Sequence, residues 1–296
     1  MAAATGARER TVTASVEMSS GKTAADENFP VGSWLLPPAL RPHVAIFYAF
    51  ARAIDDIADN SVLPPTEKLA RLDGFAAALS GASPAAPGYD KAHRMRSSLA
   101  ETGITDRHCL DLVAAFKQDS VKGRYADWGE LIGYCLLSAS PVGRYLLDLH
   151  GESRHAYPIA DALCNALQIL NHLQDCQDDY RQLDRVYLPL DWLAAAGGTV
   201  EALDQPQSLP AVRQVIDRCL DGVDRLLDSA AALPGSLRSR RLAMESAVTW
   251  RLARRLAARL RRGDPLAERV ALSRTDFLGC GLAGIEDARR VARQLD

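Results

Sequence analysis

Two clusters of aspartates are the residues of this chain whose type and spacing best predict chemistry. The first is DDIAD at residues 55–59 and the second is DCQDD at residues 175–179. Each lies in an apolar stretch with helical periodicity, where residues four apart share a face. Carboxylates stacked in this way repel each other unless a cation lies between them. Mg²⁺ takes one or two protein carboxylates and adds water and phosphate oxygens, so the clusters predict a magnesium-diphosphate site between two facing helices.

Polar residues extend the first cluster towards the start of its helix. Counting back by fours from Asp56 gives Arg52 and then Tyr48. Taken alone, Arg52 and Asp56 read as an intrahelical ion pair, which contributes about 0.2–0.5 kcal/mol. The surrounding carboxylates favour a role for Arg52 in binding diphosphate, because guanidinium matches phosphate oxygens bidentately.

The second cluster ends a stripe of polar residues on an otherwise apolar helix. Gln168, Asn171, Asp175 and Asp179 follow one another at spacings of three, four and four. For a lone aspartate a solvated face is the better explanation, but four polar residues in line predict a buried hydrogen-bond network or a binding site. Their oxygen atoms suit Mg²⁺ and not Zn²⁺. His172 is expected to point a different way and to pack as an ordinary interior residue.

The elements that must position these clusters are helices. Helical periodicity runs through nearly all 296 residues, with no alternating strand, repeat or second composition, which predicts one all-α domain. Residues 1–25 are expected to form a disordered tail, and residues 26–296 the domain. Helices are expected from Pro37 through the first cluster and over 66–81, 106–118, 128–137, 141–150, 158–180, 188–196, 209–232, 237–262 and 276–295, with loops at 81–88 and 197–210.

Composition narrows the class of protein. A net charge of −2 argues against a nucleic-acid partner. Six scattered cysteines without a CxxC pair indicate reduced thiols and a cytoplasmic location. No apolar run is long enough for a spanning helix. Arginines are interspersed with leucines over residues 251–262. This pattern is better explained as a solvated helix face than as a lipid-binding one, and peripheral contact with the inner membrane stays an alternative.

The motifs around both clusters resemble the signatures of squalene and phytoene synthases. The first signature is matched by NFP at 28–30, LLP at 35–37 and FYAFARAIDDIAD at 47–59, and the second by NHLQD at 171–175, DDY at 178–180 and RVYLP at 185–189. Asp119, RY at 124–125, YC at 134–135 and PVG at 141–143 look like the middle segment of the family. The resemblance covers almost everything after residue 26. It implies an isoprenoid-synthase-type helical bundle around a central apolar cavity.

Within that family, three features are similar to the bacterial hydroxysqualene synthases of hopanoid biosynthesis, the HpnC type. Gln174 replaces the usual arginine, Asp264 replaces a common tyrosine, and residues 27–31 read ENFPV. This resemblance implies Mg²⁺- or Mn²⁺-dependent ionisation of presqualene diphosphate, supplied by another squalene-pathway enzyme, and capture of water without NADPH. Two alternatives stay open: a squalene or phytoene synthase that joins two prenyl diphosphates, and a non-catalytic helical assembly factor.

The stripes and the resemblance together give expected roles to individual residues. Catalysis is expected of Tyr48, Asp55, Asp59, Asp175 and Asp179. Metal binding is expected of Asp55, Asp56, Asp59, Asn171, Asp175 and Asp179. Substrate binding is expected of Asn28, Phe29, Tyr48, Arg52, Gln168, Gln174 and Tyr187.

Overall fold

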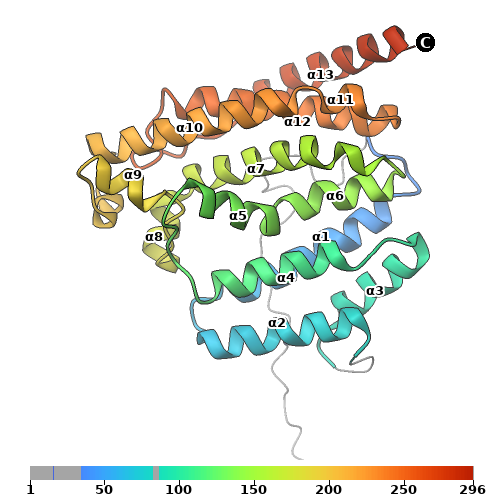
Figure 1. Ribbon diagram of the computed structural model, residues 1–296, viewed down its shortest axis with the longest axis horizontal. Helices are drawn as coiled ribbons and strands as arrows, with labels where there is room; N and C mark the ends of the chain where they lie inside the picture. Colours follow the sequence, from blue (N-terminus) through green and yellow to red (C-terminus); the bar gives the residue numbers. More distant parts are fainter. Residues whose placement is uncertain (1–15, 17–34, 83–86, 296) are drawn as a thin grey trace, which may run out of the picture.

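The protein is a layered bundle of helices (Figure 1). The computed structural model describes residue 16, residues 35–82 and residues 87–295, with side chains described as far as residue 284. One outer layer contains α2 (Pro65–Ser80) and α3 (Asp90–Thr102), and the next contains α1 (Arg41–Ala58) and α4 (Arg107–Asp119). The middle of the bundle is formed by α5 (Trp128–Ser138), α6 (Ser140–Leu149) and α7 (Tyr157–Gln174). Beyond them lie α10 (Pro210–Ala230), α12 (Arg240–Leu260) and, outermost, α13 (Arg274–Leu295).

Shorter elements connect these layers. They are η1 (Arg154–Ala156), α8 (Cys176–Leu183), α9 (Leu190–Ala195), η2 (Val200–Asp204) and α11 (Leu233–Ser236). The described residues form no named strand, and Arg124 and Val186 form an isolated parallel bridge. The all-α prediction is therefore confirmed. No described helix has the length and apolar character needed to cross a membrane.

Helix α1 carries the first aspartate cluster at its end. Val44, Phe47 and Ile54 are buried at helical spacing, which packs one face of α1 into the core. The helix begins at Arg41, later than the expected Pro37, because residues 35–40 form turns. It ends at Ala58, and Asp59 is its C-cap, with its backbone N–H donating to the carbonyl of Asp55. Asp55 and Asp59 therefore lie at the carboxyl end of the helix.

The predicted helix 158–180 was wrong as one element, because it breaks at Asp175. This residue has φ −101° and ψ 8° and separates α7 from α8. Backbone hydrogen bonds nevertheless run from Asp175 to Asn171 (3.0 Å) and from Asp179 to Asp175 (2.8 Å). The break thus changes the direction of the chain while it preserves the i, i+4 relation within the second cluster.

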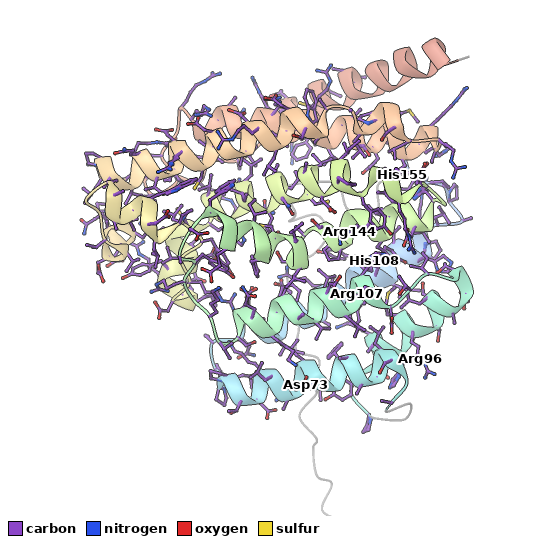
Figure 2. All side chains as sticks on the ribbon, in the orientation of Figure 1. Asp73, Arg96, Arg107, His108, Arg144 and His155 are labelled. Atoms are coloured by element: carbon purple, nitrogen blue, oxygen red, sulfur yellow. The ribbon has the colours of Figure 1, made fainter. Side chains whose placement is uncertain are left out.

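Polar side chains join the middle layers of the bundle (Figure 2). Arg144 of α6 binds Asp161 of α7 through two hydrogen bonds of 2.8 and 2.6 Å. Nε2 of His108 in α4 lies 2.9 Å from a carboxylate oxygen of Asp148 in α6, which also accepts from the Tyr157 hydroxyl. Both pairs are shielded from solvent, so they fix the relative placement of α4, α6 and α7.

The arginines of α12 are engaged within the protein. Arg261 pairs with Asp221 and Asp224 of α10, and Arg255 pairs with Asp276 of α13. Helix α13 also packs along α12, so α12 is not the outermost helix of the bundle. The interpretation of these arginines as a polar face fits the structure better than a lipid contact.

Candidate functional site

The first cluster forms a compact acidic group at the end of α1. Arg52 lies 3.0 Å from Asp55 and 3.2 Å from Asp56, so the intrahelical ion pair considered from the sequence is present. Burial and the neighbouring Asp59 carboxylate raise the pKa of Asp55 well above its ordinary value, although Arg52 opposes the shift. Burial and the crowding of carboxylates therefore outweigh the stabilisation of the charged form of Asp55 by Arg52.

Arg185 joins the first cluster to the segment that follows the second. Its side chain is buried, and Nη1 donates to Asp59 Oδ1 at 2.6 Å while Nη2 donates to the carbonyl of Ala58 at 2.8 Å. Burial alone would lower the pKa of Arg185, but Tyr187, Asp119 and Asp59 outweigh it and raise the pKa. The guanidinium therefore stays charged and links residues 126 positions apart.

His172 lies beside the second cluster. The Gln168 amide donates to Nε2 of His172 at 3.1 Å, and Nδ1 lies 3.9 Å from Asp179. The imidazole stacks on the Tyr187 ring, with 3.6 Å between centroids and 12° between planes. The prediction that His172 points away from the polar stripe was wrong, because it contacts Gln168 one turn earlier and approaches Asp179, whereas its stacking on Tyr187 agrees with the expected packed histidine.

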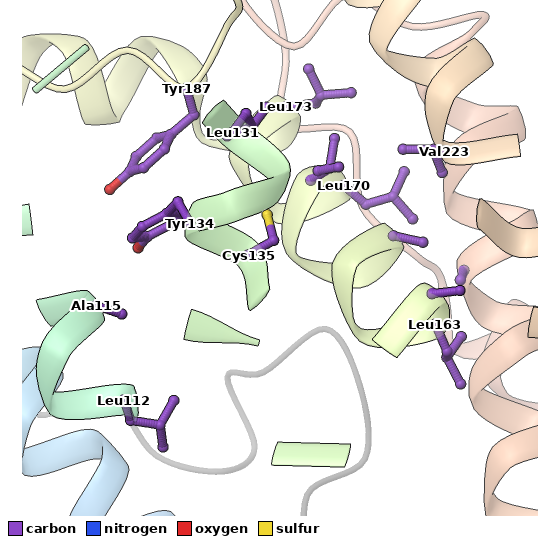
Figure 3. Packing of buried hydrophobic residues seen from close by; sticks show 14 of the residues in the cluster. Leu112, Ala115, Leu131, Tyr134, Cys135, Leu163, Leu170, Leu173, Tyr187 and Val223 are labelled. Carbon is purple, nitrogen blue, oxygen red and sulfur yellow. The ribbon is translucent and has the colours of Figure 1, made fainter. Parts of the chain in front are cut away.

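A buried hydrogen-bond network lies between the two clusters. Asp119, the last residue of α4, accepts hydrogen bonds from the hydroxyls of Tyr134 (2.5 Å) and Tyr187 (3.0 Å). The rings of Tyr134 and Tyr187 lie side by side in Figure 3, with 5.6 Å between their centroids. Burial raises the pKa of Asp119 to about 6, although Arg185 and the two tyrosine hydroxyls oppose the shift. These contacts make Asp119 the central acceptor of the network.

Two extended segments carry this network. Val186 N–H donates to the Gly123 carbonyl at 2.8 Å, and Leu190 N–H donates to the Tyr125 carbonyl at 3.0 Å. Gly123 is required at this crossing, since a Cβ there would lie 2.5 Å from the Asp184 carbonyl oxygen. The pairing places Arg185 and Tyr187 beside the end of α4, although they are far from it in sequence.

The polar groups form one connected site. The Asp59–Arg185 pair marks its α1 end and the His172–Asp179 contact its α7–α8 end, with Asp119 and Tyr187 between. Among the described residues, no three carboxylate, histidine or cysteine side chains are close enough to hold a metal ion by themselves.

A family model for squalene/phytoene synthase matches residues 22–276. The chain belongs to the squalene/phytoene synthase family. The resemblance found from the two signatures is thereby confirmed, and the middle segment that contains Asp119 and Tyr134 lies within the match.

Individual members of the family are similar over most of their length. The hydroxysqualene synthase of Rhodopseudomonas palustris is 45% identical over 267 residues, which are 90% of this chain and 90% of that protein. That of Zymomonas mobilis subsp. mobilis is 42% identical over 262 residues, 88% of this chain and 87% of the relative. The crystal structure of squalene synthase HpnC from Alicyclobacillus acidocaldarius superimposes with a TM-score of 0.70 at 29% identity, covering 81% of this chain and 90% of that one. These matches confirm the isoprenoid-synthase fold.

The remaining expected site residues occupy different places in this squalene/phytoene synthase fold. Gln174 is buried and donates to the Val270 carbonyl at 2.6 Å, which ties the end of α7 to the segment before α13. Tyr48 is half-buried on α1, and Asp175 is exposed at the α7–α8 break. Asn28 and Phe29 lie outside the described residues. The substrate-binding roles of these residues stay predictions.

Asp119, Tyr134 and Arg185 were not among the residues assigned a role from the sequence. They come from α4, α5 and the segment after α8, so no single helical stripe contains them. The only signal for them was their position in the motifs that resemble the family, which gave no role to any of the three.

Proposed function

We propose that the protein is a hydroxysqualene synthase. It would ionise presqualene diphosphate, let the resulting cation rearrange and capture water, and release hydroxysqualene and diphosphate. The identities of 45% and 42% with hydroxysqualene synthases, over about nine tenths of the chain, support this substrate and product. The observation that carries the proposal is the series of contacts between the clusters: Arg185 pairs with Asp59, Tyr187 donates to Asp119 and stacks on His172, and His172 lies 3.9 Å from Asp179.

The donor set fits Mg²⁺, with Mn²⁺ as a substitute. Asp55, Asp56 and Asp59 at one end, and Asn171, Asp175 and Asp179 at the other, would hold it together with diphosphate oxygens. The raised pKa of Asp55 supports this assignment, because burial and the neighbouring Asp59 carboxylate disfavour its negative charge, which a bound cation would stabilise. When bound, the metal supplies Lewis-acid neutralisation of the charge that develops on the leaving group.

The residues of the chain itself would orient the substrate and protect the cation. Arg52 lies among the carboxylates, where its guanidinium can also meet a diphosphate oxygen. The Tyr187 ring stacks on His172, and the Tyr134 ring lies tilted beside both, so aromatic rings lie next to the acidic groups. Aromatic faces attract cations, with a contribution of about 1–2 kcal/mol where water is excluded. The apolar helices around the site would limit the entry of water until rearrangement is complete.

Substitution of the aspartates tests the metal assignment. Asp55→Asn and Asp175→Asn each remove one anionic ligand, and we expect turnover of presqualene diphosphate to fall at least about 100-fold with unchanged circular dichroism. Asp73→Asn is a matched control on the surface of α2, and its turnover should equal that of the wild type. Wild-type turnover in either site variant would rule out the metal assignment.

The principal alternative is a squalene synthase, the name carried by the Alicyclobacillus structure. Incubation with presqualene diphosphate or farnesyl diphosphate, Mg²⁺, and NADPH present or omitted separates the two activities by product mass. We expect hydroxysqualene from presqualene diphosphate whether or not NADPH is added. Squalene formed only with NADPH would establish the alternative, and absence of diphosphate release would favour the assembly factor.

We also place the enzyme in the cytoplasm with peripheral contact at the inner membrane, where another squalene-pathway enzyme would hand over its substrate. The support is the outer face of α13, where Leu278 and Leu282 lie four residues apart and are each 66% exposed. Arg274 is exposed one turn earlier on the same stripe. A helix with apolar and cationic side chains on its outer face suits the surface of an anionic bilayer.

A further inference from the structure

The carboxyl end of α1 concentrates negative charge. Asp55, Asp56 and Asp59 lie in the last turn and at the cap, where the helix dipole also has its negative end. No basic residue lies in the last turn of α1. Arg52, one turn earlier, pairs with Asp55 and Asp56, and the cations that contact the last carbonyl of the helix come from other elements of the fold.

Two cations from different elements bind the same backbone atom. Lys68 Nζ of α2 donates to the carbonyl oxygen of Ala58 at 2.7 Å. Arg185 Nη2, from the segment after α8, donates to that oxygen at 2.8 Å. The carbonyl that ends α1 is thus fixed from two sides, directly before the Asp59 cap.

The two cations make different contacts. Arg185 divides its guanidinium between the Ala58 carbonyl and the Asp59 carboxylate. A metal that takes the Asp59 carboxylate would compete with Arg185 for it. Lys68 donates to the carbonyl, so its hydrogen bond can persist while the carboxylate changes partner.

We propose that Lys68 is a positioning residue of the diphosphate site, which holds the carbonyl end of α1 so that Asp55 and Asp59 keep their orientation towards the ligand. The inference rests on the proposed function, because it assumes that these carboxylates bind Mg²⁺ with diphosphate. It adds a residue that lies outside both aspartate signatures. In this role Lys68 acts through the backbone of α1 and is not itself a ligand of the metal.

Calorimetric titration with Mg²⁺ and inorganic diphosphate tests the proposal without the lipid substrate. Lys68→Met should weaken Mg²⁺-dependent diphosphate binding about 10-fold or more, the usual effect of losing a group that orients a metal ligand. Lys68→Arg should restore most of the affinity, since guanidinium also donates to a carbonyl. The matched control is Lys117→Met, which removes another partly exposed lysine that reaches α2, through a 2.5 Å pair with Asp73 (labelled in Figure 2).

The outcomes separate the two proposals. If the wild type binds diphosphate with Mg²⁺ and Lys68→Met binds as tightly as Lys117→Met, the positioning role is wrong while the proposed function stands. If the wild type binds no diphosphate in the presence of Mg²⁺, the metal site and the role of Lys68 are both wrong. Melting temperatures without ligand identify a general loss of fold, and diphosphate binding is then compared at a temperature at which the wild type and both variants are folded, where Lys68→Met should show the same weakening.

Discussion

The pKa of the Asp119 carboxyl group depends strongly on folding. Burial raises its pKa from 3.8 to about 6, although Arg185, Tyr134 and Tyr187 favour the charged form. Between these two values the folded protein binds this proton more tightly than the unfolded chain does. The contribution of Asp119 to the free energy of unfolding is therefore largest below pH 4, decreases as the pH rises towards 6 and is constant above that.

Asp119→Asn should remove this pH dependence. A pKa difference of about 2 between the folded and unfolded states corresponds to about 3 kcal/mol, so the wild type should lose up to that amount between pH 4 and pH 6 relative to the variant. Urea unfolding at several pH values gives the slope of the free energy of unfolding against pH for the wild type and for the variant. Since Asp55 and other carboxylates titrate in both proteins, only the difference reports on Asp119. The same dependence on pH in both proteins would contradict the raised pKa of Asp119.

Spacing along one helix revealed part of the site. Asp55 with Asp59, and Asp175 with Asp179, were identified because an i, i+4 pair needs only local geometry. The direction of His172 was wrong although its i, i+4 relation to Gln168 is also local, whereas its contact with Tyr187 comes from another segment. The acceptor role of Asp119 depends on hydroxyls from α5 and from the chain after α8, and helical periodicity contains no information about such contacts.

At the scale of elements, one loop carboxylate caps a helix from the other half of the chain. Glu152, which follows α6, is buried and accepts hydrogen bonds from the backbone N–H groups of Arg238 (3.0 Å) and Ser239 (2.6 Å). Ser239 is the N-cap of α12, where the helix dipole favours an anion. Glu152 therefore fastens the start of α12 to the middle layers.

Glu152→Ala should destabilise the protein by about 2 kcal/mol, because it leaves two N–H groups and the amino end of α12 without their acceptor. Equilibrium unfolding in urea gives the change in free energy. Glu268→Ala is the control, since that glutamate is exposed after α12 and its loss should cost less than about 0.5 kcal/mol. Equal effects of the two substitutions would show that the cap contributes nothing.

The helices with strong apolar periodicity were predictable to within a few residues. Helices α10 and α12 were expected at 209–232 and 237–262 and are found at Pro210–Ala230 and Arg240–Leu260. Helix α3 was not predicted, because its sequence is mostly polar and few of its residues are buried. The break at Asp175 was also missed, since helical hydrogen bonds and spacing continue on both sides of it.

At the scale of the whole molecule, the layers leave the outer face of α13 without a cover in the described structure. Flotation with anionic liposomes should carry part of the wild-type protein upward, and neutral liposomes should carry less. The double variant Leu278→Ser with Leu282→Ser should reduce liposome binding at least about 10-fold, because the protein then loses two apolar side chains that would be buried in the membrane surface. Val62→Ser with Val121→Ser, exposed elsewhere, is the control. Wild-type protein that stays at the bottom of every gradient would contradict membrane contact.

The backbone contacts at Gly123 hold together the segments beside the proposed diphosphate site. Hydrogen bonds from Val186 and Leu190 already immobilise these backbone segments in the free protein, so a ligand loses little affinity to conformational entropy there. Recognition of the leaving group is thereby separated from recognition of the hydrocarbon. Substitutions on the apolar faces of α4 and α7 could change the accepted chain length without rebuilding the charged end.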